Sequence, residues 1–312
     1  MAEQIADVIL MVRPARFGFN PETAANNAFQ HNDARLSAEE VSRKALAEFD
    51  GFVGQLRNAG IEVIVADDTP EPVKTDAVFP NNWVTFHEDG RVFTFPMFSP
   101  NRRLERSEAM LERLRARFAV HDRIRMEAAE SDNRFLEGTG SMVLDRENRL
   151  IYACTSPRTD PELTREFARQ TGYEPVLFRA VDQNGTEIYH TNVMMALGET
   201  FAVICLESIA GAEEREMVAD KLRSTGKEII GISFEQMNAF AGNMLQVRSK
   251  DGRRFLVMSE QAYRALDERQ IARIEAHTRI LHAPLYTIET YGGGSARCMM
   301  AEIFLPEKTP AT

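Results

Sequence analysis

The chain has 312 residues, of which 44% are hydrophobic, and a formal net charge of −10 at pH 7. This length supports an extensive hydrophobic core, and the acidic balance argues against nucleic-acid binding. No run approaches the about 18 apolar residues of a membrane-spanning helix, residues 1–5 are not typical of a secretory signal, and three cysteines without metal-ligand spacing indicate a reducing cytoplasm.

Helical patterns with recognisable ends recur along the chain. The first begins at the capping box Ser37–Glu40 and ends at Gly60, before an apolar strand at 61–65. The next helix is expected at about 103–118. Further helices, each followed by a strand, are expected at 160–172 with 174–178, at 212–225 with 228–232, and at 259–277 with 279–281.

A small or polar cluster followed by an apolar strand recurs five times between these helices. With Asn82, Gly138, Thr191, Asn243 and Gly294 as markers, the successive steps are 56, 53, 52 and 51 residues. Each cluster except the last is followed by a strand, a turn-like stretch and a second apolar run, which is typical of a hairpin. So regular a step indicates internal repetition.

The repeating unit is therefore helix, strand and hairpin. Five such modules closing around a centre predict an α/β fold, a pseudo-fivefold propeller with its active site on the central axis. Because no linker interrupts the repeats, we expect a single catalytic domain over residues 1–312. Alternatively, the five polar strand starts are only turns at one end of the fold, but ordinary turns do not require an acid, a histidine and a cysteine in register.

The candidate catalytic residues are Cys298, His190 and Glu137, which come from three different repeats. A thiol nucleophile needs a neighbouring base, and the glycines before Cys298 would allow a small substrate to approach closely. Taken alone, Cys298 would more often be structural, but its register with the other two residues favours catalysis. Cys205 and Cys154 are expected to be buried, although Cys154 could line the site.

The other histidines form no metal constellation, and His87 is expected to be exposed in a hairpin turn. Arg102 and Arg103 begin a charge-rich run that is mostly a solvated helix face. One of these two arginines could face inward and hold a substrate carboxylate through its bidentate fork.

Three segments resemble motifs of the pentein guanidino-modifying superfamily: Glu137–Gly140, His190–Asn192 and Gly292–Met299. This superfamily includes arginine deiminases, dimethylarginine dimethylaminohydrolases, agmatine deiminases and amidinotransferases. The resemblance spans nearly the whole chain and implies a five-module α/β propeller. The stretches 76–79 and 99–105 are similar to the dimethylaminohydrolase pattern, which implies that Asp76 and Arg102 contact the amino-acid part of the substrate.

Two positions depart from the superfamily pattern. Deiminases place an Asp against the guanidinium where this chain has Asn82, and many have His-x-Asp where this chain has His190-Thr191-Asn192. An amide carries no charge to pair with a guanidinium, so a neutral ureido group, as in citrulline, would suit the site better. Residues 79–83 are also similar to the citrulline-utilisation hydrolase branch, which implies release of ornithine, carbon dioxide and ammonia.

The expected reaction begins with attack by the Cys298 thiolate on the ureido or guanidino carbon, while His190 acts first as general acid and then as general base. Glu137 would align the substrate nitrogens. The expected substrate-binding set is Asp76, Asn81, Asn82, Arg102, Asn192 and Asn243. We expect no metal or organic cofactor. The expected partner is a small amino-acid substrate, with no nucleic acid and no membrane, and a homo-oligomer remains possible.

Other activities of the superfamily remain alternatives at this stage. They are arginine deiminase, arginine dihydrolase, dimethylarginine hydrolase and amidinotransferase. The resemblance also implies this fold for non-catalytic binding proteins such as ribosome anti-association factors, but these have no need for Cys, His and Glu at equivalent repeat positions.

Overall fold

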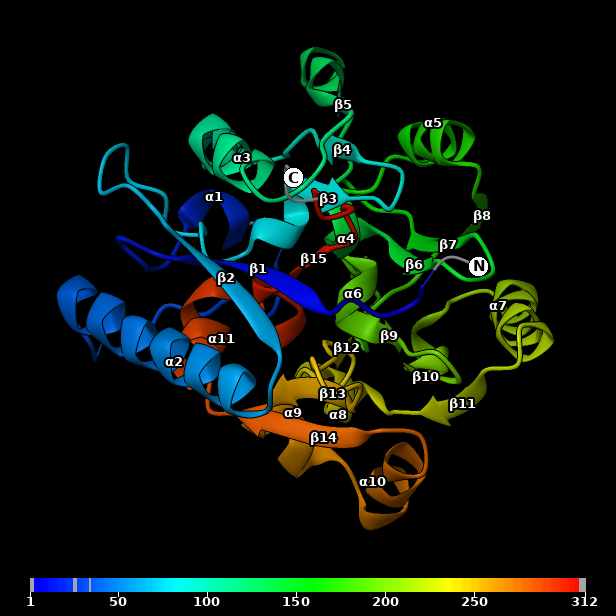
Figure 1. The fold of residues 1–312 in the computed structure, drawn as a ribbon. Coiled ribbons are helices and arrows are strands. Elements are labelled where there is room, and N and C mark those ends of the chain that lie inside the picture. The colour runs from blue at the N-terminus through cyan, green and yellow to red at the C-terminus, as the bar shows by residue number, and fades with distance from the viewer. Residues whose placement is uncertain (1–2, 25–26, 34, 309–312) are drawn as a thin grey trace.

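The computed structural model describes residues 3–24, 27–33 and 35–308. Its strands form five three-stranded sheets around a common centre, with the longer helices outside them (Figure 1). In every sheet the middle strand pairs antiparallel with an inner strand and parallel with an outer strand. The predicted five-module α/β propeller is confirmed.

The sheets contain these strands, inner strand first: β15 (Ala301–Ile303), β1 (Val8–Arg13) and β2 (Glu62–Asp67); β3 (Val84–Phe86), β4 (Arg91–Thr94) and β5 (Asp122–Arg125); β6 (Val143–Asp145), β7 (Leu150–Cys154) and β8 (Glu174–Phe178); β9 (Met195–Leu197), β10 (Phe201–Ile204) and β11 (Glu228–Gly231); β12 (Leu245–Arg248), β13 (Arg254–Ser259) and β14 (Arg279–Ala283).

The first sheet explains why the last repeat lacks a second apolar run. Strand β1 takes that place, with Val8 opposite Ile303 and Leu10 opposite Ala301, and then pairs in parallel with β2. No repeat pattern in the sequence predicted β1, because the strand it pairs with, β15, lies near the other end of the chain. Strands from near both termini thus close the ring of sheets.

The α-helices of the described residues are α1 (Pro21–Ala24), α2 (Ala38–Asn58), α3 (Glu108–Arg115), α4 (Gly138–Ser141), α5 (Pro161–Thr171), α6 (Thr191–Met194), α7 (Ala212–Ser224), α8 (Phe234–Asn238), α9 (Glu260–Ala265), α10 (Glu268–Glu275) and α11 (Tyr286–Gly292). Short 3₁₀ helices occupy Pro80–Asn82, Pro100–Glu105, Glu127–Asp132, Leu206–Ser208 and Ala296–Met299. No helix among these is long and apolar enough to cross a membrane.

The predicted caps of α2 and α5 are confirmed. Ser37 and Glu40 form the capping box of α2, Asp160 accepts a hydrogen bond from Leu163 N, and Gly172 ends α5 in the left-handed region. One face of α2 then packs its buried side chains against the sheet of β1 and β2. These side chains are Val41, Ala45, Phe49, Phe52, Val53 and Leu56.

Three sequence predictions were wrong. The helix expected at about 103–118 starts later, because the chain first forms a 3₁₀ turn and Ser107 then caps α3. The helix expected at 259–277 is divided, since Asp267 and Gln270 form a capping box that starts α10. His87 is buried rather than exposed: its ring packs edge-on against Phe93, and its Nε2 lies 3.0 Å from Thr85 Oγ1.

Short helices that precede the inner strands meet at the centre. Helix α4 contacts both Pro80–Asn82 and α6, and Pro80–Asn82 also contacts Ala296–Met299. These contacts bring together segments that are far apart in sequence, as the propeller prediction requires. The candidate residues of four repeats therefore lie in one region.

Candidate active site

Two glycines allow the central segments to approach one another. Gly138 has φ of 48°, and a Cβ at this position would lie 2.3 Å from the backbone oxygen of Asn81. A Cβ on Gly140 would lie 2.4 Å from Asn82 Nδ2 and 2.7 Å from His190 Nδ1. Glycine at these positions therefore lets the segment after Glu137 contact the modules on both sides.

Glu137 and His190 form a buried pair, with Oε2 of Glu137 lying 2.8 Å from Nε2 of His190. The other carboxylate oxygen accepts a hydrogen bond of 2.9 Å from Phe98 N, and Arg158 Nη1 lies 3.5 Å from Oε2. Burial opposes the charged form of Glu137, but the Arg158 guanidinium and the hydrogen bond from His190 hold the pKa of this carboxyl below its ordinary value.

Burial lowers the pKa of His190 to about 4, against the attraction of Glu137. The imidazole is therefore neutral at pH 7. Since the ionised carboxylate of Glu137 only accepts hydrogen bonds, the hydrogen lies on Nε2 and the lone pair lies on Nδ1. Nδ1 faces Gly140 beside the Asn82 amide, so it is the nitrogen available as a base.

Cys298 lies in the 3₁₀ helix Ala296–Met299, and its side chain lines the central cavity. Its Sγ accepts hydrogen bonds from Asn192 Nδ2 at 3.4 Å and from Asn243 Nδ2 at 3.3 Å. Cys154 is buried and does not line this cavity, and burial raises its pKa to about 12. Of these two thiols, only that of Cys298 lines the cavity.

Asn82 and Arg102 lie side by side at the cavity. Arg102 Nη1 donates a hydrogen bond of 2.9 Å to Asn82 Oδ1, while Nε and Nη2 donate to the two carboxylate oxygens of Glu105, both at 2.9 Å. Arg102 is the inward-facing member of the pair of arginines, and Arg103 instead donates to the backbone oxygen of Met97. The two hydrogen bonds to Glu105 hold the Arg102 guanidinium in one orientation.

Asp76 also lines the cavity. Its Oδ2 accepts a hydrogen bond of 2.7 Å from Asn20 Nδ2 and lies 3.7 Å from Arg102 Nε, whereas its Oδ1 has no hydrogen-bond partner among the described residues. Burial raises the pKa of Asp76, although the charge of Arg102 opposes this shift. The free oxygen is an acceptor available to a ligand.

Three of the expected substrate-binding residues do not line the cavity. Asn192 and Asn243 contact the sulfur of Cys298 instead. Asn81 Nδ2 donates to Thr139 Oγ1 at 3.3 Å and so links two modules. The structure thus brings Asp76, Asn82, Arg102, His190 and Cys298 to the cavity wall, with Glu137 behind His190.

Sequence reasoning missed several residues of the cavity wall. Arg158 is 2% exposed, and its guanidinium lies 5.0 Å from the centre of the Tyr189 ring. Arg158 lies just after β7, in a polar loop of the second repeat, and this position is the sequence feature that could have identified it. Thr23 and Asn27 lie before α2, outside any repeat, so no pattern pointed to them. The missed wall residues are Thr23, Asn27, Phe79, Arg158 and Tyr189, whereas Gly292–Gly294 are the glycines already expected beside Cys298.

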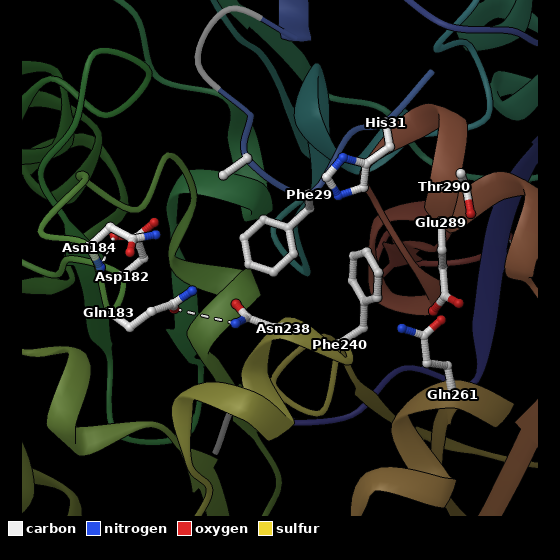
Figure 2. A pocket seen from close by; sticks show the side chains of 11 residues that line it. Phe29, His31, Asp182, Gln183, Asn184, Asn238, Phe240, Gln261, Glu289 and Thr290 are labelled. Atoms are coloured by element: carbon white, nitrogen blue, oxygen red, sulfur yellow. Dashed lines mark hydrogen bonds between the residues drawn. The ribbon is translucent and has the colours of Figure 1, made fainter. Parts of the chain in front are cut away.

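The cavity itself encloses only about 20 Å³. A larger hollow of about 380 Å³ lies nearby, between Phe29, Asp182, Asn238, Phe240 and Glu289 (Figure 2). Neither Cys298 nor His190 lines this hollow, whereas both line the smaller cavity, so we take the smaller cavity as the candidate active site.

The sequence of this chain matches a known protein family. The family model "N,N dimethylarginine dimethylhydrolase, eukaryotic" matches residues 13–305. A search of curated proteins finds no match.

Among the described residues, no group of three or more His, Cys, Asp or Glu side chains could hold a metal ion.

Several solved structures share the fold. The N-terminal domain of ArgZ bound to product, an arginine dihydrolase from the ornithine-ammonia cycle in Cyanobacteria, is 19% identical with a TM-score of 0.71, and the match covers 97% of this chain and 100% of that domain. AgrE in complex with ornithine and NAD+ is 16% identical with a TM-score of 0.71, and the match covers 97% of this chain but 40% of AgrE. A dimethylarginine dimethylaminohydrolase in adduct with S-methyl-L-thiocitrulline is 16% identical with a TM-score of 0.65, and the match covers 96% of this chain and 100% of that one.

The five-module fold and these matches define a protein of the pentein guanidino-modifying superfamily, which confirms the resemblance seen in the sequence. Within that superfamily, the chain belongs to the N,N dimethylarginine dimethylhydrolase family. Relatives in this family and fold are hydrolases that act on guanidino C–N bonds.

Proposed function

We propose that this chain is a cysteine-dependent hydrolase of citrulline, which converts citrulline and water to ornithine, carbon dioxide and ammonia. Its catalytic residues are Cys298, His190 and Glu137, within a single cytoplasmic domain over residues 1–312. The observation that carries the proposal is the orientation of the Asn82 amide. Arginine side chains only donate hydrogen bonds, so the contact from Arg102 identifies the Asn82 atom it meets as oxygen.

The NH₂ group of Asn82 is consequently the end that remains for a ligand. Nδ2 is buried and has no hydrogen-bond partner among the described residues. A guanidinium has only N–H donors and cannot accept from this group, whereas the oxygen of a ureido group can. The geometry of Asn82 therefore favours a neutral ureido substrate over arginine.

The charged residues of the wall suit the other end of an amino acid. The guanidiniums of Arg102 and Arg158 can attract the α-carboxylate, and Asp76 Oδ1 can accept a hydrogen bond from the α-ammonium group. Thr23 and Asn27 cover the same cavity.

In the proposed reaction, the Cys298 sulfur attacks the ureido carbon while Asn82 donates to the ureido oxygen. Nδ1 of His190 takes the proton of the Cys298 thiol and passes it to the departing ornithine nitrogen as the C–N bond breaks, leaving a carbamoyl thioester on Cys298. The same nitrogen then takes a proton from water, which attacks this carbonyl and frees the thiol. The carbamate released decomposes to carbon dioxide and ammonia. Glu137 keeps the imidazole in the required tautomer.

The test is product analysis with purified protein. Citrulline should yield equal amounts of ornithine and ammonia, and Cys298→Ser should abolish turnover while citrulline still binds. If Cys298→Ser retained turnover, the nucleophile would be another group.

Arginine dihydrolase activity is the second candidate, because the fold of ArgZ covers nearly this entire chain. Such an enzyme would convert arginine to ornithine in one site, so ornithine formed from arginine distinguishes the two activities. A deiminase would stop at citrulline, and an amidinotransferase would require an acceptor amine and release little ammonia.

A further inference from the structure

Two side-chain amides contact the sulfur of Cys298 from a position outside the cavity wall. Nδ2 of Asn243 lies 3.3 Å from Sγ, and Nδ2 of Asn192 lies 3.4 Å from it. Both asparagines are fully buried. The rest of the hydrogen-bond network shows how firmly each amide is held: Asn243 is held through both of its amide atoms, whereas Asn192 Oδ1 has no hydrogen-bond partner among the described residues.

The backbone determines the orientation of Asn243. Its Oδ1 accepts a hydrogen bond of 3.1 Å from Arg297 N, and its Nδ2 donates one of 3.0 Å to the backbone oxygen of Asn192. A backbone N–H only donates and a carbonyl only accepts, so the opposite orientation would lose both bonds. The second hydrogen of Nδ2 is then left for Cys298 Sγ.

We infer that Asn243 and Asn192 stabilise Cys298 as a thiolate, by directing two N–H groups at its sulfur. They are positioning residues for the nucleophile rather than groups that bind the substrate. Hydrogen bonds to an ionised acceptor are stronger than those to a neutral one, so the two N–H groups favour the thiolate over the thiol, and that of Asn243 is held in place by the backbone. The inference rests on the proposed role of Cys298 as nucleophile.

A neutral substrate makes such donors necessary. A cationic guanidinium would bring its own positive charge to the sulfur, whereas a ureido group brings none. His190 is neutral at pH 7 and cannot supply a charge before it receives a proton.

The test measures the pH dependence of Cys298 alkylation by iodoacetamide, without substrate, with the labelled residue identified by mass spectrometry. Asn243→Leu and Asn192→Leu keep the side-chain volume but remove the donor. The matched control is Gln246→Leu, which removes another buried amide of the module that contains Asn243. The Gln246 amide accepts a hydrogen bond from Glu199 N and, among the described residues, makes none to the sulfur. Burial raises the pKa of Cys154 to about 12 and that of Cys205 to about 11, so these thiols stay unlabelled near neutral pH.

Each Asn variant should move the midpoint of alkylation upward by about one pH unit, equivalent to about tenfold slower labelling at neutral pH, while Gln246→Leu keeps the wild-type midpoint. Unchanged midpoints in both Asn variants would overturn the inference, and so would an equal shift in the control. Should a Leu variant lose the native unfolding transition, the corresponding Ala variant replaces it with the same expected shift. Because no substrate is present, the outcome does not depend on whether citrulline is the substrate.

Discussion

Arg102 donates a hydrogen bond of 2.9 Å from Nη1 to Oδ1 of Asn82, and this contact determines which end of the Asn82 amide faces the cavity. Glu105 holds the same guanidinium by two further hydrogen bonds. The choice between a neutral and a cationic substrate thus depends on a short chain of buried side chains, of which only Asn82 and Arg102 line the cavity.

Replacing Asn82 by an acid should reverse the substrate preference. In Asn82→Asp, an acceptor with negative charge replaces the donor, so kcat/KM for citrulline should fall by at least about tenfold and that for arginine should rise. Steady-state kinetics with both substrates checks this. Asn82→Ala is the control, because it removes the donor without adding an acceptor and should slow citrulline without helping arginine. Unchanged citrulline kinetics in Asn82→Asp would refute the role of the amide.

Weakening the hydrogen bonds between Arg102 and Glu105 should also reduce activity, although Glu105 does not line the cavity. In Glu105→Gln, the bidentate acceptor of Arg102 is lost, and kcat/KM for citrulline should fall about tenfold. Glu108→Gln is a matched control, since Glu108 pairs with Arg123 at the surface. Equal kinetics in the two variants would show that Glu105 does not position Arg102.

A methyl group at residue 140 should disturb the centre of the site while leaving the fold intact. The Cβ of Gly140→Ala would press on Asn82 Nδ2 and His190 Nδ1, at 2.4 and 2.7 Å in the present geometry. A misplacement of about 1 Å in a catalytic group can cost about 100-fold in rate, so kcat of Gly140→Ala should fall by about this factor. Gly231→Ala, where a Cβ meets nothing within 4 Å, should keep wild-type kcat. Similar rates in both variants would contradict the close packing around Gly140.

Stability should fall in acid partly because of His87. Burial, together with the charge of Arg146, lowers its pKa to about 3, while an unfolded histidine has a pKa of about 6.5. The unfolded chain therefore binds this proton more readily than the folded protein, and protonation favours unfolding. The contribution of neutral His87 to the free energy of unfolding is complete above about pH 6.5 and is lost as pH falls toward 3.

Urea unfolding at several pH values tests this contribution. Between about pH 6 and pH 4, the free energy of unfolding of His87→Gln should depend on pH less steeply than that of the wild type, by about 1.4 kcal/mol per pH unit. Parallel curves for the two proteins would show that His87 is not held neutral by its burial.

The sequence was sufficient to predict the five repeats, because each hairpin and helix has a local pattern of apolar residues and caps. It did not reveal β1 as the missing strand of the last repeat, since that pairing joins residues near opposite termini. Nor did it reveal that β5 is a strand, because Asp122–Arg125 is mostly charged and only partly buried.

Within the site, repetition placed Glu137, His190 and Cys298 in one region. Arg158 lies in the same repeat as Glu137 but outside its polar cluster, and Asn20 lies outside every repeat. For Asn192 and Asn243 the region was right, but their contacts with the sulfur depend on side-chain orientations that no sequence pattern encodes.

The most direct test of the proposed function compares kcat/KM for citrulline, arginine and dimethylarginine with the same preparation of wild-type protein. The orientation of Asn82 predicts that citrulline is preferred over both guanidino substrates by at least about tenfold, with one ornithine formed for each citrulline consumed. Faster turnover of arginine or dimethylarginine, with citrulline left intact, would contradict it.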